Sequence, residues 1–181
     1  MLHAVGVIEL KSIAKGMEAC DSALKSANVR MISASAACPG KYEMLLTGEI
    51  SAVQAALDQV RARFGQYVID TVLLGRIEEA VICALMGGQV TPKPGAVGII
   101  ETYTAASAIK AADTAVKTAE VEIVDLRVSR GMGGKGVVII TGSIGAVQAA
   151  TEAGSNYAKQ EGLFAASSVM AAPHEDLWRY M

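Results

Sequence analysis

The cysteines are the side chains of this sequence with the widest chemistry, because a thiolate can act as a nucleophile or bind a soft metal centre. There are three, Cys20, Cys38 and Cys83, and their spacing forms no CxxC pair. Pro39 and Gly40 follow Cys38 directly, which is typical of a tight turn. A lone loop cysteine is usually only a small side chain. It can also be one ligand of a zinc ion or an iron–sulfur cluster whose other ligands come from elsewhere.

The remaining candidates favour structural roles. Cys20 lies in an alanine-rich stretch and Cys83 in the apolar run AVICALM, so both are predicted to be small core residues. His3 precedes the first apolar run, and His174 begins a short terminal segment. The stretch RGMGGKG (130–136) lacks the GxxxxGK pattern followed by Ser or Thr and leads into an apolar run, so it does not predict phosphate binding. Because the sequence shows no acid–base pair or activated nucleophile, we expect that the protein is not an enzyme.

Composition and charge argue against several classes of protein. The 181 residues are 52% hydrophobic with only 4% aromatic, and the formal net charge is −2, which gives no basic surface for nucleic acid. Charged residues interrupt the apolar runs, so no membrane span is predicted, and the first residues lack the pattern of a signal peptide. An odd number of cysteines fits a reducing compartment better than a disulfide framework. We therefore expect a soluble intracellular protein.

The chain contains two copies of one pattern, because four blocks of sequence recur in order. They are AVGVIE (4–9) and AVGIIE (96–101), ACDSALKSANV (19–29) and AADTAVKTAEV (111–121), TGEISAVQAAL (47–57) and TGSIGAVQAAT (141–151), and EEAV (78–81) and EDLW (175–178). The shift is 92 positions in the first two blocks and 94 in the third, and it grows to 97 if EEAV pairs with EDLW. The second copy therefore gains two residues in the segment that contains Cys38 in the first. Such repeats indicate a tandem duplication. Glycines and prolines cluster at 87–95, which predicts domains at 1–90 and 95–181.

Both copies have the same predicted order of elements. Apolar or alternating runs predict the strands, at 4–9, 29–35, 42–47 and 68–74 in the first copy and at 96–101, 121–129, 137–141 and 163–170 in the second. The first helices are expected to follow Ser12 and Thr104 and to end near Ala27 and Ala119. The second helices are expected to begin near Ser51 and Gly145, and a short helix is expected after each last strand. This βαββαβ order is the ferredoxin-like α+β plan, with one antiparallel sheet and its helices on one face.

Several of these stretches resemble a known family. AVGVIE, ALKSANV, the Gly-Gly-Lys loop followed by a strand, and TGSIGAVQAATEAG are similar to the shell proteins of bacterial microcompartments, and the similarity covers nearly the whole chain. It is greatest to the tandem-domain shell proteins of propanediol-utilisation compartments, through GVIELKSIAKGMEACDSALKSANV, CPGKY and PHEDLWRYM. The resemblance implies two shell domains per chain and a homotrimer that forms a pseudo-hexameric tile. It also implies edge-to-edge packing with other shell proteins, in the shell of a cytoplasmic compartment.

The resemblance further implies where the central pore of the tile lies. In this family the loops between the second and third strands, here 35–41 and 129–136, line the pore. The implied pore-loop residues are Ala37, Cys38, Pro39, Gly40 and Lys41 in the first copy, and Arg130, Gly131, Met132 and Gly133 in the second. Three chains around one axis would bring three Cys38 thiols together. Relatives that share CPGKY hold an iron–sulfur cluster of the 4Fe-4S type there, so the resemblance implies Cys38 as a metal ligand. The second copy has no cysteine in this loop, so the ligation would be threefold.

The lysine of the KSANV motif lies at the tile edge in this family, which implies edge contacts for Lys25 and Lys117. Taken alone, each is an ordinary solvated lysine near a helix C-terminus, where a cation is favourable. Arg76 matches the arginine that accompanies this lysine in single-domain relatives. The second copy has Ala172 in that position, so the edges are not all equivalent.

The implied function is that of a structural tile whose cluster passes electrons across the shell, for example to an encapsulated redox enzyme, or delivers iron–sulfur units inward. Two alternatives remain at this stage. One is a metabolite-transport pore in which Cys38 binds no cluster. The other is a small-molecule sensor with ligands between subunits, which rests on analogy of fold alone.

Overall fold

The computed structural model describes residues 4–88, 95–129 and 131–181, which form two compact units. The first unit comprises Met1–Ile77 with Ser129–Gly134, and the second comprises Glu78–Val128 with Lys135–Met181. His3, Arg130 and most of the predicted linker lie outside the described residues. The predicted domain boundary between 90 and 95 therefore stays a prediction.

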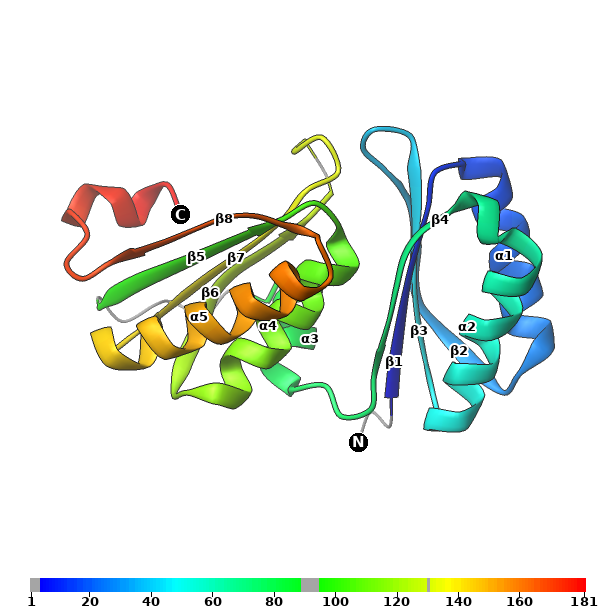
Figure 1. Ribbon diagram of the computed structural model, residues 1–181, viewed down its shortest axis with the longest axis horizontal. Coiled ribbons are helices and arrows are strands. Elements are labelled where there is room, and N and C mark those ends of the chain that lie inside the picture. Colours follow the sequence, from blue (N-terminus) through cyan, green and yellow to red (C-terminus); the bar gives the residue numbers. More distant parts are fainter. Residues whose placement is uncertain (1–3, 89–94, 130) are drawn as a thin grey trace. The chain divides into compact units, whose positions relative to one another are not determined.

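The first unit is a four-stranded antiparallel sheet in the order β2-β3-β1-β4. Figure 1 shows both of its long helices on the same face of that sheet. Its elements are β1 (Ala4–Leu10), α1 (Ile13–Ser26), β2 (Val29–Ala37), β3 (Lys41–Gly48), α2 (Ile50–Phe64), the 3-10 turn η1 (Gly65–Tyr67) and β4 (Val68–Leu74).

The second unit repeats this plan, with strand order β6-β7-β5-β8 and α4 and α5 on one face. Its elements are α3 (Glu79–Leu85), β5 (Ala96–Thr102), α4 (Ala105–Thr118), β6 (Val121–Val128), β7 (Gly136–Gly142), α5 (Ile144–Gln160), β8 (Phe164–Met170) and η2 (Glu175–Arg179). The predicted α+β ferredoxin-like plan is confirmed in both copies. The last segment differs from the prediction in one detail, because η2 is a 3-10 helix whereas its counterpart α3 is an α-helix.

The helices begin where the sequence predicted, for a local reason. The hydroxyl oxygens of Ser12 and Thr104 accept hydrogen bonds from the backbone N–H groups of Lys15 (3.3 Å) and Ser107 (3.1 Å). Each hydroxyl thereby satisfies one of the unpaired donors of a helix N-terminus. The helices then bury one face against the sheet, and in the first unit the buried core joins Ile8 and Met44 to Leu57 of α2.

The two residues gained by the second copy lie in the hairpin loop. Ala36 pairs with Tyr42 in the first copy, and the matching pair in the second copy is Val128 with Gly136. Both pairs occupy the same place in the ladder, so only the loop beyond them differs in length. The insertion therefore lengthens the predicted pore loop and leaves the sheet unchanged.

Each copy needs one glycine where the first helix meets the sheet. A Cβ on Gly16 of α1 would lie 2.3 Å from the Cβ of Tyr42 on β3. In the second copy the helix position is Ala108 and the strand position is Gly136, where an added Cβ would lie 2.3 Å from the Cβ of Ala108. The glycine is on the helix in the first copy and on the strand in the second. One of the two positions must be glycine, because two side chains cannot occupy this space.

Replacement of Gly16 by Ala is expected to lower the free energy of unfolding by about 1–3 kcal/mol, since the new methyl group overpacks the contact with Tyr42. The measurement is urea denaturation followed by circular dichroism. Gly145→Ala is the matched control, because an added Cβ there meets nothing within 4 Å, and it should change stability by less than about 0.5 kcal/mol. Equal effects of the two substitutions would contradict this account of the helix–sheet contact.

Candidate functional site

The loop between β2 and β3 presents one thiol at its tip. Only Cys38, Pro39 and Gly40 separate the strands, and the N–H of Gly40 donates to the carbonyl oxygen of Ala37 at 2.9 Å. Gly40 has φ +89°, a conformation that favours glycine, and the Cys38–Pro39 peptide bond is cis. Cys38 is exposed, and a Cβ on Gly40 would meet nothing within 4 Å. The loop thus holds a solvent-facing thiol beside open space.

The corresponding loop of the second copy has the flexibility of glycine and no thiol. Gly131, Gly133 and Gly134 all have positive φ, at +73°, +63° and +88°, and Met132 is half-buried. Residues Ser129–Gly134 belong to the first compact unit, where the carbonyl oxygen of Gly134 accepts a hydrogen bond from Lys41 Nζ at 3.1 Å. The loop leads into β7 and not into a helix, so it provides no helix N-terminus for a phosphate group.

An ion pair that the sequence reading missed fixes the base of the first loop. Lys41 Nζ lies 3.1 Å from a carboxylate oxygen of Glu9 on β1, with the two side chains 11% and 0% exposed. Lys41 is one of the predicted pore-loop residues, and within the chain its ammonium group contacts Glu9 of β1. Its place at a pore stays a prediction. The second copy has the same pair between Lys135 and Glu101 at 2.9 Å, and this bond raises the pKa of Lys135. The repetition of both residues in the two copies was the available signal.

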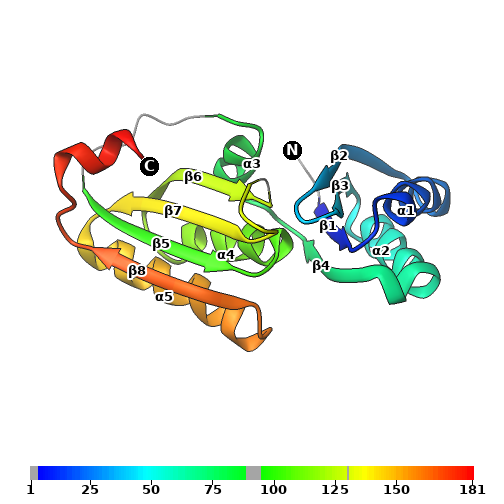
Figure 2. The same cartoon turned by 90° about the horizontal axis from the view of Figure 1, so that it is seen from above.

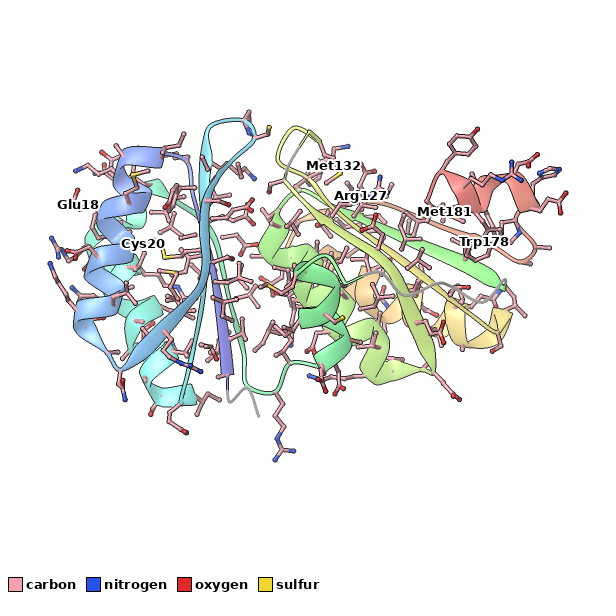
Figure 3. The ribbon with its side chains drawn as sticks, turned by 180° about the vertical axis from the view of Figure 1, so that it is seen from behind. Glu18, Cys20, Arg127, Met132, Trp178 and Met181 are labelled. Atoms are coloured by element: carbon pink, nitrogen blue, oxygen red, sulfur yellow. The ribbon has the colours of Figure 1, made fainter. Side chains whose placement is uncertain are left out.

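The other two cysteines, Cys20 and Cys83, differ in how far they are buried. Cys20 is half-buried on α1, with its sulfur 3.7 Å from that of Met44, and burial raises the pKa of its thiol. Figure 3 shows its side chain directed from α1 toward the sheet, so the predicted packing role is confirmed. For Cys83 the prediction of a core residue is wrong, because Cys83 is exposed. Val81 provides the buried side of α3, and a residue two positions further on points away from it.

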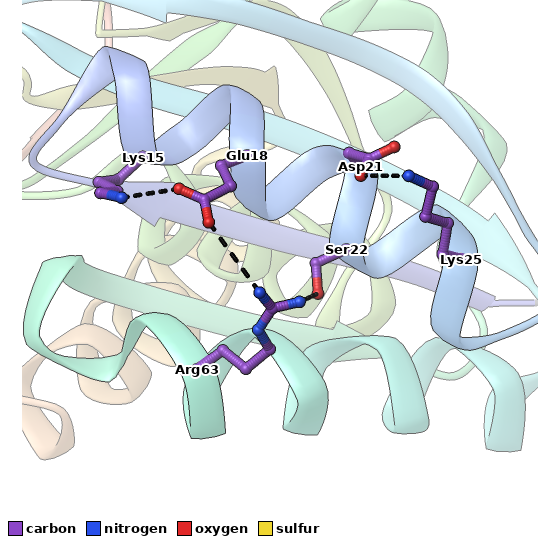
Figure 4. Close-up of polar contacts among 6 residues, drawn as sticks. All are labelled: Lys15, Glu18, Asp21, Ser22, Lys25 and Arg63. Carbon is purple, nitrogen blue, oxygen red and sulfur yellow. Dashed lines mark hydrogen bonds and ion pairs between the residues drawn. The ribbon is translucent and has the colours of Figure 1, made fainter.

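The predicted edge lysines each have a carboxylate partner on their own helix. Lys25 Nζ lies 2.7 Å from Asp21, as Figure 4 shows, and the side chains are 74% and 62% exposed. Lys117 lies 2.7 Å from Asp113 in the same arrangement, but here Asp113 is only 1% exposed. Arg76 is exposed, beyond the end of β4. The edge role of these three residues stays a prediction.

The structure places few of the candidate groups together within one chain. In the described parts of the chain, no three side chains from His, Cys, Asp and Glu are grouped so that they could hold a metal ion. His174 caps η2, where its Nδ1 accepts from the N–H of Asp176 at 3.2 Å, which fits the predicted structural role. No helix of the described residues is long and apolar enough to cross a bilayer.

Comparison with known proteins agrees with this duplicated fold. The sequence model of the BMC domain matches residues 4–77 and matches residues 96–173 a second time. The chain belongs to the BMC-domain family. It is 40% identical over 181 residues to the bacterial microcompartment shell protein PduT of Citrobacter freundii, covering all of this chain and 98% of PduT. It is also 40% identical over 83 residues to the shell protein PduA of the same organism, covering 45% of this chain and 86% of PduA.

A solved structure extends the comparison to three dimensions. The crystal structure of a microcompartment protein from Desulfitobacterium hafniense DCB superposes with a TM-score of 0.86 at 36% identity, over 99% of both chains. This BMC-domain chain is therefore a structural shell protein of a bacterial microcompartment, with two BMC domains in tandem. The resemblance to tandem-domain microcompartment shell proteins, which the sequence predicted, is confirmed.

Removal of Lys41 is expected to destabilise the fold more than removal of its counterpart. Lys41→Met removes one partner of a buried ion pair, the ammonium group 3.1 Å from the fully buried carboxylate of Glu9, and breaking a buried pair typically costs about 3–5 kcal/mol. Lys135→Met breaks a pair whose side chains are 41% and 31% exposed, where solvent screens the attraction, so its loss should cost much less. Thermal and urea denaturation of the two variants measure the difference. A larger loss in Lys135→Met would refute the view that the two pairs differ through burial.

Proposed function

We propose that this shell protein forms a trimeric tile whose three Cys38 thiolates hold an iron–sulfur cluster of the 4Fe-4S type at a central pore. The observation that carries the proposal is the exposure of Cys38 at the tip of the β2–β3 loop. The second copy has a glycine-rich loop in the corresponding place, with no cysteine. A chain with two pseudo-equivalent loops and one thiol supplies one ligand for each full chain around a threefold axis.

The residues around Cys38 fit such a group in three respects. Thiolate sulfur is the usual protein ligand of iron–sulfur clusters. The thiol faces solvent, and the absence of any atom within 4 Å of a Cβ on Gly40 leaves room for a bulky group. One chain offers only this thiol in the loop, so the donor set requires neighbouring chains. Three cysteines would leave one iron for a ligand that is not a cysteine of the loop.

The chain itself would act as a rigid mount for the ligand. The hydrogen bond from the Gly40 N–H to Ala37 closes the turn, and the Lys41–Glu9 pair ties the end of the loop to β1. These contacts restrict the position of the Cys38 sulfur before any ligand binds. A bound cluster would supply one-electron redox chemistry, which suits electron transfer across the shell, with an encapsulated redox enzyme as one partner. Inward delivery of iron–sulfur units would use the same ligand.

Cys38→Ser is expected to abolish cluster binding and to leave the trimer intact. After anaerobic purification, wild-type protein should contain iron and acid-labile sulfide and absorb in the visible range, and Cys38→Ser should lose all three signals. Cys83→Ser is the matched control, since Cys83 is also exposed but lies on α3. Trimeric wild-type protein without iron or sulfide would refute the cluster and favour the alternative of a metabolite-transport pore.

We also propose that Lys25 and Lys117 form contacts between tiles, together with Arg76. The double variant Lys25→Ala with Lys117→Ala should prevent the assembly of extended sheets, seen by electron microscopy, and leave the mass of the trimer unchanged. Each lost contact contributes only about 0.2–1 kcal/mol, but a tile would lose six of them. Lys15→Ala is the control, because Lys15 is an exposed lysine of the same helix that pairs with Glu18 at 2.7 Å (Figure 4). Unchanged sheets in the double variant would refute the edge role.

A further inference from the structure

The segment that follows the first copy is docked on the second. Helix α3 comes directly after the residues that match the first BMC domain, yet it belongs to the second compact unit and packs on β6 and α4. Figure 2 shows α3 beside β6. Its side chain Val81 is fully buried. The tail of one copy therefore completes the surface of the next copy along the chain.

A polar contact fixes the start of this docked segment. The N–H of Glu78 donates to one carboxylate oxygen of Asp113 at 3.0 Å, and the other oxygen accepts from Lys117 at 2.7 Å. Asp113 is 1% exposed as a result of burial within this unit. The docked tail thus contacts two features of the second unit. One is the Asp–Lys pair on α4, and the other is the edge strand β6.

The first copy has the same two features, an Asp–Lys pair on its first helix and an edge strand, but among the described residues no tail is docked on them. Asp21 and Lys25 on α1 match Asp113 and Lys117 in the repeat and have the same 2.7 Å pair, but Asp21 is 62% exposed. On the neighbouring strand β2, Arg30, Ser33, Ala34 and Ala36 are exposed. Among the described residues, no helix of the first unit packs on β2 in the way that α3 packs on β6.

The second copy also has a tail after its last strand, because η2 follows β8 as α3 follows β4. The two tails correspond at a shift of 96, because β4 and β8 have the same register (Val68 pairs with Leu10, Phe164 with Thr102) and Glu78 and His174 each precede the helix that follows. Leu177 therefore corresponds to the buried anchor Val81, and Trp178 is the next residue. In this chain Trp178 is only half-buried and Tyr180, two residues later, is 80% exposed. Figure 3 shows Trp178 on the terminal segment. A large indole on an exposed terminal turn is a typical anchor for a protein surface.

We propose that the C-terminal segment 174–181 docks on the β2 and α1 surface of a neighbouring copy of this chain, with Leu177 and Trp178 as its apolar anchors and the His174 N–H donating to Asp21. The occupant is a second copy because the chain already shows the same tail on the same receptor features, in α3 on the second unit. Successive head-to-tail contacts of this kind form a closed ring when the rotation between neighbours is a whole fraction of a turn, which is 120° in the proposed trimer. The inference rests on the proposed trimer and names residues that would hold it together.

Cross-linking tests the contact directly. In a Cys38→Ser, Cys83→Ser background, Asp21→Cys and Glu175→Cys are combined and treated with a short thiol-specific cross-linker. Denaturing gels should show loss of the single-chain band into two-chain and three-chain bands, and neither single cysteine variant should do so. Glu79→Cys with Asp113→Cys is the matched positive control, because Glu79 corresponds to Glu175, and it should cross-link within one chain. Only single-chain products from Asp21→Cys with Glu175→Cys would overturn the proposal.

A second measurement covers the event that the cysteine variants fail to fold. Trp178 is the only tryptophan, so fluorescence of the wild-type protein reports its environment alone. Trp178 should be shielded from acrylamide in the assembled protein, and Asp21→Lys should raise its quenching. Wild-type trimers by sedimentation with an unshielded Trp178 would overturn the docking and leave the trimeric tile standing. Wild-type monomers would overturn both.

Discussion

The short distance between the first helix and the sheet is the constraint on which both domains depend. Either the helix or the strand must lack a side chain at the crossing, and the two copies meet this requirement in opposite ways, with Gly16 against Tyr42 and Gly136 against Ala108. Close approach lets small residues form a dense core in a chain with few aromatics. It also seats α1 and α4 so that their Asp–Lys pairs lie next to the edge strands β2 and β6.

The hairpin loops illustrate how duplication allows division of roles. Both loops join strands that pair in the same register. In both copies a lysine at the end of the loop also pairs with a glutamate of a central strand. The first is short and carries Cys38, whereas the second has two more residues and three glycines with positive φ. In the proposed trimeric tile, a loop residue present in both copies would occur six times around the axis. Two copies in one chain allow a residue to be placed three times, which is the number that the proposed cluster requires.

The terminal segments give the duplication a further consequence. Helix α3 covers the edge of the second unit, while its counterpart η2 ends the chain. A tail that packs on the following copy cannot pack on its own, and among the described residues neither η2 nor the β2 surface of the first unit has a contact like that of α3 with β6. The physical requirement to bury the apolar anchor of each tail favours an assembly of several chains.

The sequence by itself determined the duplication, the order of elements and the helix starts, because these depend on local patterns such as the alternation of apolar residues and the hydroxyl groups of Ser12 and Thr104. It also pointed to Cys38, whose Pro-Gly neighbours predict a turn in any context. Only the tertiary structure decided which side chains lie across the sheet from each other. It paired Lys41 with Glu9, exposed Cys83 and exchanged the glycine between helix and strand. It also assigned α3 to the second unit, since such contacts join residues far apart in the chain and leave no local pattern.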